Sequence, residues 1–324
     1  MNILKAILIG AVIIALAVFP LLTERQAIIN LFILILLFLT LAQSWNLLGG
    51  YAGQINLGHA AFFGLGSLAA RLLWMSGQPF WLSLMAGGAL AVAFALLIGV
   101  PAFRLRGIYF AIGTLALGEI LNVTVGNRLP IVSALPAQYL ATYDLASRYY
   151  LVLGLAILTT GATYFLVNSR LGLGMMAVRE EEGAAESLGI SALRHKLLAL
   201  CVSAFFAGLA GGGFAYYHVS YYYQLPFSPL WTFDSMLMAF IGGVGTVIGP
   251  IVGAVFYVVV KEILAVRLVE AHLIIFGVLF ILVVLFLPGG LVQAWGKIQG
   301  AVARRSTSKA SRRPLSSGIE SRNR

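Results

Sequence analysis

The sequence predicts an all-α, polytopic integral membrane protein with about ten transmembrane helices and a short polar helix on its cytoplasmic side. Of the 324 residues, 60% are hydrophobic and 10% are charged, and the mean hydropathy is +0.97. The apolar runs approach or reach the roughly 20 residues that a helix needs to cross a bilayer. Many of the charges gather in one hydrophilic stretch, REEEGAAESLGISALRHK, from Arg179 to Lys196. Such a stretch is far too polar to span the bilayer.

Ten apolar stretches are predicted as membrane spans. They comprise residues 5–22, 27–48, 52–75, 80–102, 107–126, 148–167, 197–217, 233–248, 249–266 and 272–288. The first could pass for a signal peptide, but no small-residue cleavage site follows, so we expect a retained span. Arg104, Arg106, the segment 168–196 and the basic C-terminal tail should all be cytoplasmic by the positive-inside rule. Ten spans satisfy this with both termini in the cytoplasm of a bacterial-type inner membrane.

We expect one transmembrane domain over residues 1–292 and a basic, disordered cytoplasmic tail over 293–324. The tail carries most of the net charge of +10 and is suited to anionic lipid headgroups. Nucleic acid is not an expected partner, because the positive-inside rule already accounts for such a tail. The longest external segment is 127–147, which has two prolines and no helical period and is predicted as an ordered loop.

The third predicted span is rich in glycine and unusually polar. It lies within LLGGYAGQINLGHAAFFGLGSLAA, and its candidate pathway residues are Gly53, Gln54, Asn56 and His59. Polar groups at membrane depth must find partners or line a wet cavity, and a helix break near Gly49–Gly53 would free backbone groups. A translocation pathway and a structural hydrogen-bonding role both fit. A metal site at His59 is disfavoured, because no second ligand lies at a suitable spacing.

Glu119 lies about two-thirds of the way along the span 107–126, with Asn122 one turn later on the same face. A carboxylate within the membrane is by default a functional hypothesis. A proton relay would need further ionisable residues nearby, and this stretch supplies none. A hydrogen bond that anchors the helix and an acceptor that lines the pathway are equally compatible with the sequence.

Small residues recur at four-residue spacing in two later spans, which favours close helix packing. These helix-packing candidates are Gly208, Gly212, Gly245, Gly249 and Gly253. The pair Gly242–Gly243, together with Pro250, predicts a break between the eighth and ninth spans. Asp234, Lys261 and Glu262 fall near predicted span ends, where solvation is the expected account.

The sequence contains none of the nucleotide-binding or nucleophile motifs that would make this chain an enzyme. We therefore expect no catalytic residue, no metal and no cofactor. The polar helix over about 175–189 ends at Gly189, which suits the position after a helix C-terminus. An exposed helix between two spans is what a permease needs to dock into a groove of a partner ATPase. An ordinary surface helix is the alternative.

The run REEEGAAESLGI resembles the cytoplasmic motif of ABC-transporter permeases of the branched-chain amino acid family, LivM-like subunits in particular. Similar landmarks follow in the same order, including NLLGGYAGQINLGHAAFFGLGS, RLRGIYFAIGTLALGEIL and IGGVGTVIGPIVGA. The resemblance covers about residues 40–292. It implies an importer in which this chain pairs with a second homologous permease, two cytoplasmic ATP-binding subunits and an extracytoplasmic solute-binding protein. The residues it implies for coupling to the ATPase are Arg179, Glu180, Glu181, Glu182, Glu186 and Gly189.

Two departures from the family pattern bear on the substrate and the coupling. Leu173 and Met176 stand where relatives usually carry basic residues, and the segment 127–147 lacks the Thr-Gly-Gly sequence of relatives. The resemblance implies a permease for branched-chain or other amino acids. A urea or amide permease is the alternative, followed by a proton-coupled carrier that uses Glu119 or His59. An intramembrane enzyme around His59 lacks a catalytic partner.

Overall fold

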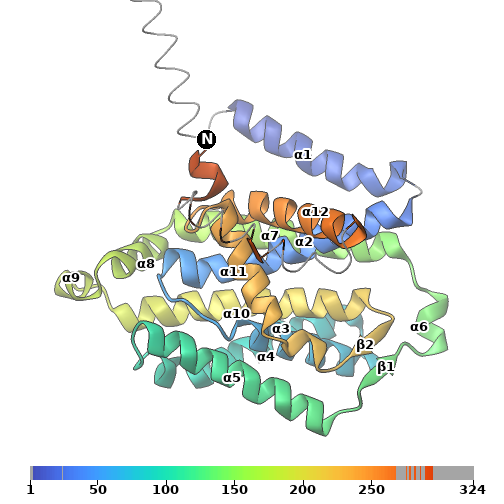
Figure 1. The fold of residues 1–324 in the computed structure, drawn as a ribbon, viewed down its shortest axis with the longest axis horizontal. Helices are drawn as coiled ribbons and strands as arrows, with labels where there is room; N and C mark the ends of the chain where they lie inside the picture. The colour runs from blue at the N-terminus through green and yellow to red at the C-terminus, as the bar shows by residue number, and fades with distance from the viewer. Residues whose placement is uncertain are drawn as a thin grey trace, which may run out of the picture.

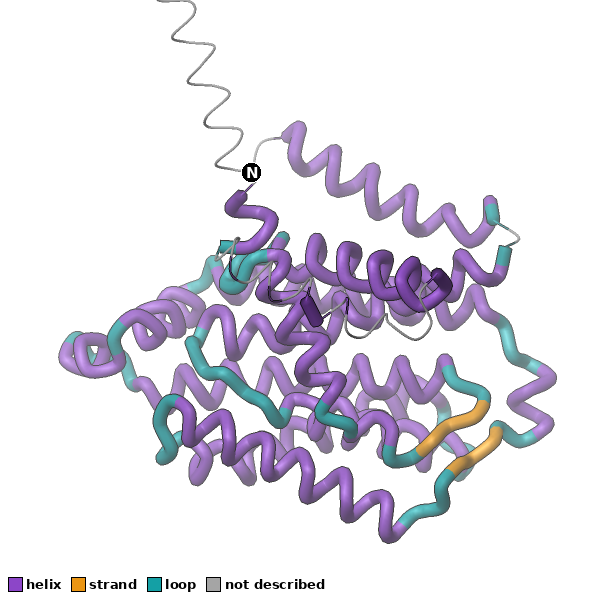
Figure 2. Tube along the Cα trace, viewed as in Figure 1, coloured by secondary structure: helices purple, strands orange, loops and turns teal. Residues whose placement is uncertain are grey.

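The computed structural model describes residues 3–23, 25–267, 275, 277–278, 281, 285 and 289–294, and these residues are mostly helical (Figures 1 and 2). The elements in chain order are α1 (Ile3–Leu22), α2 (Gln26–Asn46), the π-helical turn η1 (Leu47–Tyr51), α3 (His59–Met75), α4 (Phe80–Ala102), α5 (Ile108–Arg128), β1 (Val132–Ala134), α6 (Ala137–Ala141), α7 (Leu145–Val167), α8 (Arg170–Glu180), α9 (Glu182–Ser187), α10 (Ala192–Tyr217), β2 (Ser220–Tyr222), the 3₁₀ turn η2 (Leu225–Phe227), α11 (Leu230–Gly242) and α12 (Gly249–Arg267).

Five helices of the described chain are long and apolar enough to cross a membrane: α2 continued through η1, α4, α5, α7 and α10. They match the predicted spans that begin at residues 27, 80, 107, 148 and 197. Shorter apolar helices lie within α1 and α11. The chain is therefore a polytopic, mostly helical membrane protein. The predicted span 272–288 and the tail 293–324 lie largely outside the described residues.

Helix α10 runs through the middle of the bundle and packs against α3, α4, α2 and α7 (Figure 1). Its buried positions are mainly alanine and glycine, so neighbouring backbones approach closely. A Cβ added at Gly66 of α3 would collide with the backbone of Gly208, and one added at Gly87 of α4 would lie 2.6 Å from the carbonyl oxygen of Gly66. Small residues at such crossings let dispersion contacts hold helices together where lipid offers no hydrophobic driving force.

The predicted span 52–75 is not one continuous helix, and the break considered near Gly49–Gly53 is present. Helix α3 begins only at His59, and residues 52–58 have no regular structure. Gly53 has a φ of +69°, a conformation that only glycine adopts without strain. The carbonyl groups freed here find partners within the protein: Trp45 Nε1 donates to the oxygen of Asn56 (2.9 Å), and the Gln54 amide donates to that of Leu48 (3.1 Å). The break is tolerated because protein satisfies it.

The segment 127–147 is more structured than the sequence predicted. It contains β1 and α6, and β1 pairs antiparallel with β2, with Val132 opposite Tyr222 and Ala134 opposite Ser220. This two-stranded sheet departs from the all-α expectation. Three-residue strands carry too little pattern to be predicted, and their pairing joins segments far apart in the sequence.

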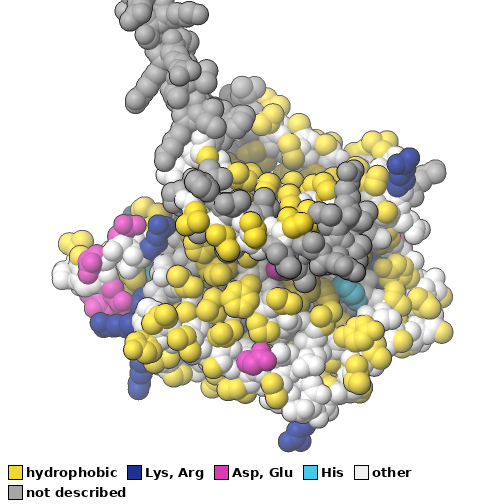
Figure 3. Space-filling model, viewed as in Figure 1, with side chains coloured by type: hydrophobic (Ala, Val, Ile, Leu, Met, Phe, Trp, Pro, Cys, Tyr) yellow, Lys and Arg dark blue, Asp and Glu magenta, His cyan; other side chains and the backbone are white. Residues whose placement is uncertain are grey.

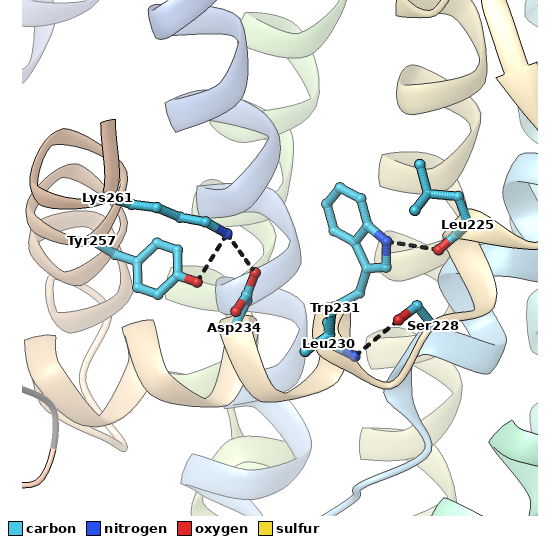
Figure 4. A network of polar contacts seen from close by, with 7 residues as sticks. All are labelled: Leu225, Ser228, Leu230, Trp231, Asp234, Tyr257 and Lys261. Atoms are coloured by element: carbon cyan, nitrogen blue, oxygen red, sulfur yellow. Dashed lines mark hydrogen bonds and ion pairs between the residues drawn. The ribbon is translucent and has the colours of Figure 1, made fainter. Parts of the chain in front are cut away.

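The predicted break between the eighth and ninth spans is present, between α11 and α12. Gly243 has a φ of +131° and Gly245 one of +74°, whereas Pro250 lies in the first turn of α12, where a missing amide is harmless. Asp234 and Lys261, for which solvation was expected, are instead paired with each other. Figure 4 shows Lys261 Nζ of α12 3.3 Å from Asp234 Oδ2 of α11 and 3.3 Å from the hydroxyl oxygen of Tyr257.

Candidate functional site

The helix break between α2 and α3 lies at the centre of the candidate site. Asn46, the last residue of α2, accepts from the Gly245 amide at Oδ1 (2.9 Å) and donates from Nδ2 to the oxygen of Thr246 (3.0 Å). The asparagine therefore joins the break to the loop between α11 and α12. At the far side of the break, the Ala60 amide donates to Thr232 Oγ1 of α11 at 2.8 Å.

The four predicted pathway residues differ in exposure. Gly53 is exposed and Gln54 half-buried, whereas Asn56 and His59 are buried at 1% and 0% exposure. Ser44 Oγ and His59 Nε2 form a hydrogen bond of 2.8 Å, and Asn56 Oδ1 accepts from the Gly58 amide at 2.8 Å. His59 and Asn56 thus stabilise the break from inside, while residues 53–55 face outward.

Glu119 and Asn122 lie together on an exposed face of α5. Asn122 Nδ2 donates to both carboxylate oxygens of Glu119, at 3.1 and 3.2 Å. The break contacts the same helix, because the Leu57 amide donates to Thr114 Oγ1 at 3.1 Å. A carboxylate on an apolar outer face is costly unless protein or water covers it.

The polar segment consists of two helices, α8 and α9, and the single predicted helix over about 175–189 is wrong. Ser169 caps α8 by accepting from the Gly172 amide, and Glu181 interrupts the segment with extended backbone, φ −156° and ψ 108°. At the end of α9, Gly189 has a φ of +81°. The Gly189 amide donates to Glu186 and the Ile190 amide to Ala185, the paired hydrogen bonds of a Schellman motif.

The six candidate coupling residues do not share one role in the structure. Glu180, Glu181 and Glu186 are exposed, as a docking surface requires. Glu182 instead forms a 2.7 Å ion pair with Lys196 of α10, whose side chain is only 7% exposed. A small apolar cluster of Val178, Ala185 and Ala192 holds α8, α9 and α10 together beside it.

Arg179 reaches into the helix break. Its Nη1 donates to the oxygen of Gly50 at 2.7 Å, and the Nε–Glu180 Oε1 distance of 3.8 Å is much longer. The glycines at 53 and 245 leave the space for this side chain, because a Cβ at Gly53 would lie 2.9 Å from Arg179 Cγ and one at Gly245 would lie 2.6 Å from Arg179 Nη1. Sequence reasoning placed Arg179 in the coupling segment and Gly53 in the pathway without predicting that they touch.

The helix-packing candidates all lie at close approaches. A Cβ at Gly208 would be 2.8 Å from that of Ala91, and one at Gly212 would be 2.5 Å from Leu84 Cδ1. Added carbons at Gly249 and Gly253 would collide with the backbone oxygens of Gly243 and Met238. Gly245 differs from the other four, because it lies beside Arg179 of α8 and has a positive φ.

Two buried arginines at the C-terminal end of α10 were missed by the sequence analysis. Arg71 of α3 donates to the oxygens of Ala215 and His218, and Arg148 of α7 donates to that of Tyr216. These carbonyls end α10, so the guanidinium groups satisfy its unpaired acceptors and complement the negative end of its dipole. Lone arginines inside apolar helices were the available signal, since a buried charge demands partners.

Among the described residues, no group of three or more His, Cys, Asp or Glu side chains could hold a metal ion.

The sequence of this chain matches those of known proteins. The family model described as branched-chain amino acid transport system / permease component matches residues 27–284. The high-affinity branched-chain amino acid transport system permease protein LivM of Escherichia coli K12 is 29% identical, covering 89% of this chain and 75% of that protein. A probable LivM of Methanocaldococcus jannaschii is 25% identical over 79% of this chain and 90% of that protein. A putative glucose ABC transporter permease of Haloferax volcanii is 26% identical, covering 60% and 61%. No solved structure matches.

Proposed function

This chain belongs to the family of permease components of branched-chain amino acid transport systems. We propose that it forms half of the translocation pathway of an ATP-driven amino acid importer. A permease component of an ABC transporter is a non-catalytic membrane subunit. The observation that carries the proposal is the α8–α9 segment, whose acidic side chains gather at one edge of a largely apolar surface (Figure 3). In an importer, that segment meets the ATP-hydrolysing partner.

The docking surface consists of Glu180, Glu181, Glu186 and Leu188. Leu188 is 82% exposed, and it directly precedes the turn at Gly189. An apolar side chain held out beside three carboxylates fits an apolar pocket with a cationic rim on the ATPase. The Glu182–Lys196 pair and the Schellman turn keep this surface in one orientation, so that the partner meets a preformed shape.

Charge reversal tests the docking surface. In the reconstituted complex, the Glu180→Lys/Glu181→Lys double variant should hydrolyse ATP without matching uptake, because like charges would face each other across the contact. The neutral Glu180→Gln/Glu181→Gln variant should lose less of its uptake than the double-lysine variant. Arg25→Glu, a reversal at an exposed residue directly before α2, is the control and should transport normally. Normal uptake in the double-lysine variant would remove these carboxylates from the contact.

The translocation pathway is proposed along the exposed faces of α5 and the 52–58 segment. Leaving Glu119 toward lipid would cost about 2.5–3.5 kcal/mol on insertion scales, so the second permease subunit and the water between the two subunits should cover it. Gln54 and Asn122 would then offer an amide on each element to a passing solute. Glu119→Gln should lower uptake and leave the assembly intact in a detergent pull-down.

The remaining assignments follow the family. We place all ten predicted spans, 272–288 included, in one domain over residues 1–292, with both termini and the tail 293–324 in the cytoplasm. One of two ATP-binding subunits would meet α8 and α9 of this chain, and the other would meet the second permease subunit. A solute-binding protein would meet the external end formed by β1, β2 and α6. Thiol labelling of single cysteines from each side of the membrane, in a Cys201→Ser chain, tests this topology.

The substrate is proposed to be a branched-chain or related amino acid, as the names of the relatives imply. Proteoliposomes that contain the complex and its binding protein should take up radiolabelled leucine when ATP is supplied. Uptake should survive an ionophore that collapses the proton gradient, because ATP hydrolysis drives it. Uptake that the ionophore abolishes at constant ATP would instead support a proton-coupled carrier. Urea and acetamide, tested as competitors, would reveal an amide permease.

A further inference from the structure

One guanidinium group connects the coupling segment to three other parts of the molecule. Arg179 lies two residues before the break between α8 and α9, and its Nη1 donates to the oxygen of Gly50 in η1 at 2.7 Å. Its methylene groups pack against Gly53, which has no side chain. Its Nη1 lies 2.6 Å from the position that a Cβ on Gly245 would take. The Arg179 side chain is 39% exposed, so the helix break between α2 and α3 reaches the surface at this end.

The segments that Arg179 touches are also tied to each other. Asn46 holds Gly245 and Thr246 through the two hydrogen bonds described above. Thr246 Oγ1 in turn donates to the oxygen of Gly243 (2.8 Å) and accepts from the Gly249 amide (2.9 Å), which caps α12. A displacement of α8 would therefore be transmitted to the break and the α11–α12 loop together.

The helix break between α2 and α3 leads directly into the 52–58 segment, which is proposed to face the solute. Three residues after Gly50, the chain turns at Gly53, and Gln54 and the 47%-exposed Ile55 follow. The segment ends against α5, where a Cβ at Gly58 would collide with the backbone of Thr114. Residues 54–57 are therefore held at both ends, by Arg179 packed against Gly53 on one side and by α5 packed against Gly58 on the other, so a displacement at one end reaches the other.

We propose that Arg179 is a positioning residue that transmits movement of the coupling segment to the 52–58 segment, which acts as a gate. This inference rests on the proposed function, because the movement comes from the partner ATPase. The arginine is suited to this role because its planar guanidinium offers several donors in a fixed geometry. When the α8–α9 segment shifts, the Gly50 carbonyl follows, and Gln54 and Ile55 move relative to α5.

The test uses the full assembly with an Ile55→Cys reporter in a Cys201→Ser chain. The labelling rate of Cys at 55 by a maleimide is compared between the ADP state and the vanadate-trapped state. With Arg179 present, the rate should differ between the states by about fivefold or more, the lower end of typical coupling between sites. In Arg179→Met the difference should vanish, and the ratio of solute imported to ATP hydrolysed should fall by a similar factor.

Arg170→Met, which removes an exposed arginine at the start of the same helix, is the matched control and should keep both the labelling difference and the ratio. Arg179→Lys keeps the charge but presents a single ammonium group, so it should show an intermediate difference. It decides the question if Arg179→Met fails to assemble. A full labelling difference in the decisive variant overturns the proposal for Arg179. Failure of the parent chain to assemble with an ATPase, or to import, would instead overturn the proposed function.

Discussion

The Glu182–Lys196 ion pair makes the structure's sharpest prediction about the coupling segment. Sequence reasoning grouped Glu182 with its neighbours as a docking residue, whereas the structure pairs it with a buried lysine. Glu182→Gln should therefore loosen α9 from α10, while Glu180→Gln, whose side chain is 78% exposed, should leave the fold of the segment unchanged. The two adjacent substitutions separate an internal role from a docking role.

The size of the effect follows from the geometry. At 2.7 Å and an effective dielectric constant near 20, the attraction amounts to about 6 kcal/mol. Desolvation of Lys196 offsets several kcal/mol of this. Because Glu182 is 39% exposed, solvent screens the pair further. The net cost of Glu182→Gln is then about 2 kcal/mol, equivalent to a roughly 30-fold rise in the local opening constant of α9.

Hydrogen exchange of peptides covering residues 181–191 measures this opening in detergent. Exchange should be about 30-fold faster in Glu182→Gln and close to that of the parent in Glu180→Gln. The double variant Glu182→Gln/Lys196→Met should recover most of the protection, because no charge is then left buried alone. Unchanged exchange in Glu182→Gln would refute the reasoning, as would equally fast exchange in the single and double variants.

Three further predictions concern packing, charge and pH. Gly208→Ala should lower the stability of the bundle by about 1–3 kcal/mol through overpacking against α4, seen as a lower melting temperature than that of Gly154→Ala, where an added Cβ meets nothing within 4 Å. Asp234→Asn or Lys261→Met alone should each cost about 1 kcal/mol, because Lys261 is 42% exposed and solvent screens the pair, and the double variant should cost less than their sum in thermal unfolding. Asp144 caps α7, and hydrogen bonds from Ser147 and Ala146 hold the pKa of its carboxyl below its usual range. The cap should therefore contribute its full stabilisation of about 0.5–1 kcal/mol above the ordinary pKa near 4. The difference in melting temperature between the parent chain and Asp144→Ala should disappear as the pH falls through the lowered pKa.

Residue pattern alone predicted much of the helical framework. Helix α4 occupies residues 80–102, as predicted, and α2, α5, α7 and α10 differ by a few residues at their ends. The turn at Gly189 and the break after Gly242 were also predicted. These features are local: an apolar run of sufficient length must satisfy its backbone within itself in a bilayer, and a glycine marks where the chain needs a positive φ.

Features that depend on distant partners escaped the sequence analysis. The sequence analysis considered a break near Gly49–Gly53, but the extent of the irregular segment 52–58 depends on the partners of its backbone groups, Trp45 of α2 and Thr114 of α5 among them. The same holds for β1 and β2, whose pairing joins segments some ninety residues apart.

The sequence by itself determined that this protein spans the membrane repeatedly and carries a polar segment between two spans, because hydropathy and charge act residue by residue. Only the tertiary structure decided what each charge does. Glu182 forms an ion pair with Lys196. Arg71 and Arg148 donate to the last carbonyl groups of α10, and Arg179 donates to the carbonyl oxygen of Gly50. A buried or half-buried charge binds whichever partner the packing of helices places within reach, and that choice is made across the bundle rather than along the chain.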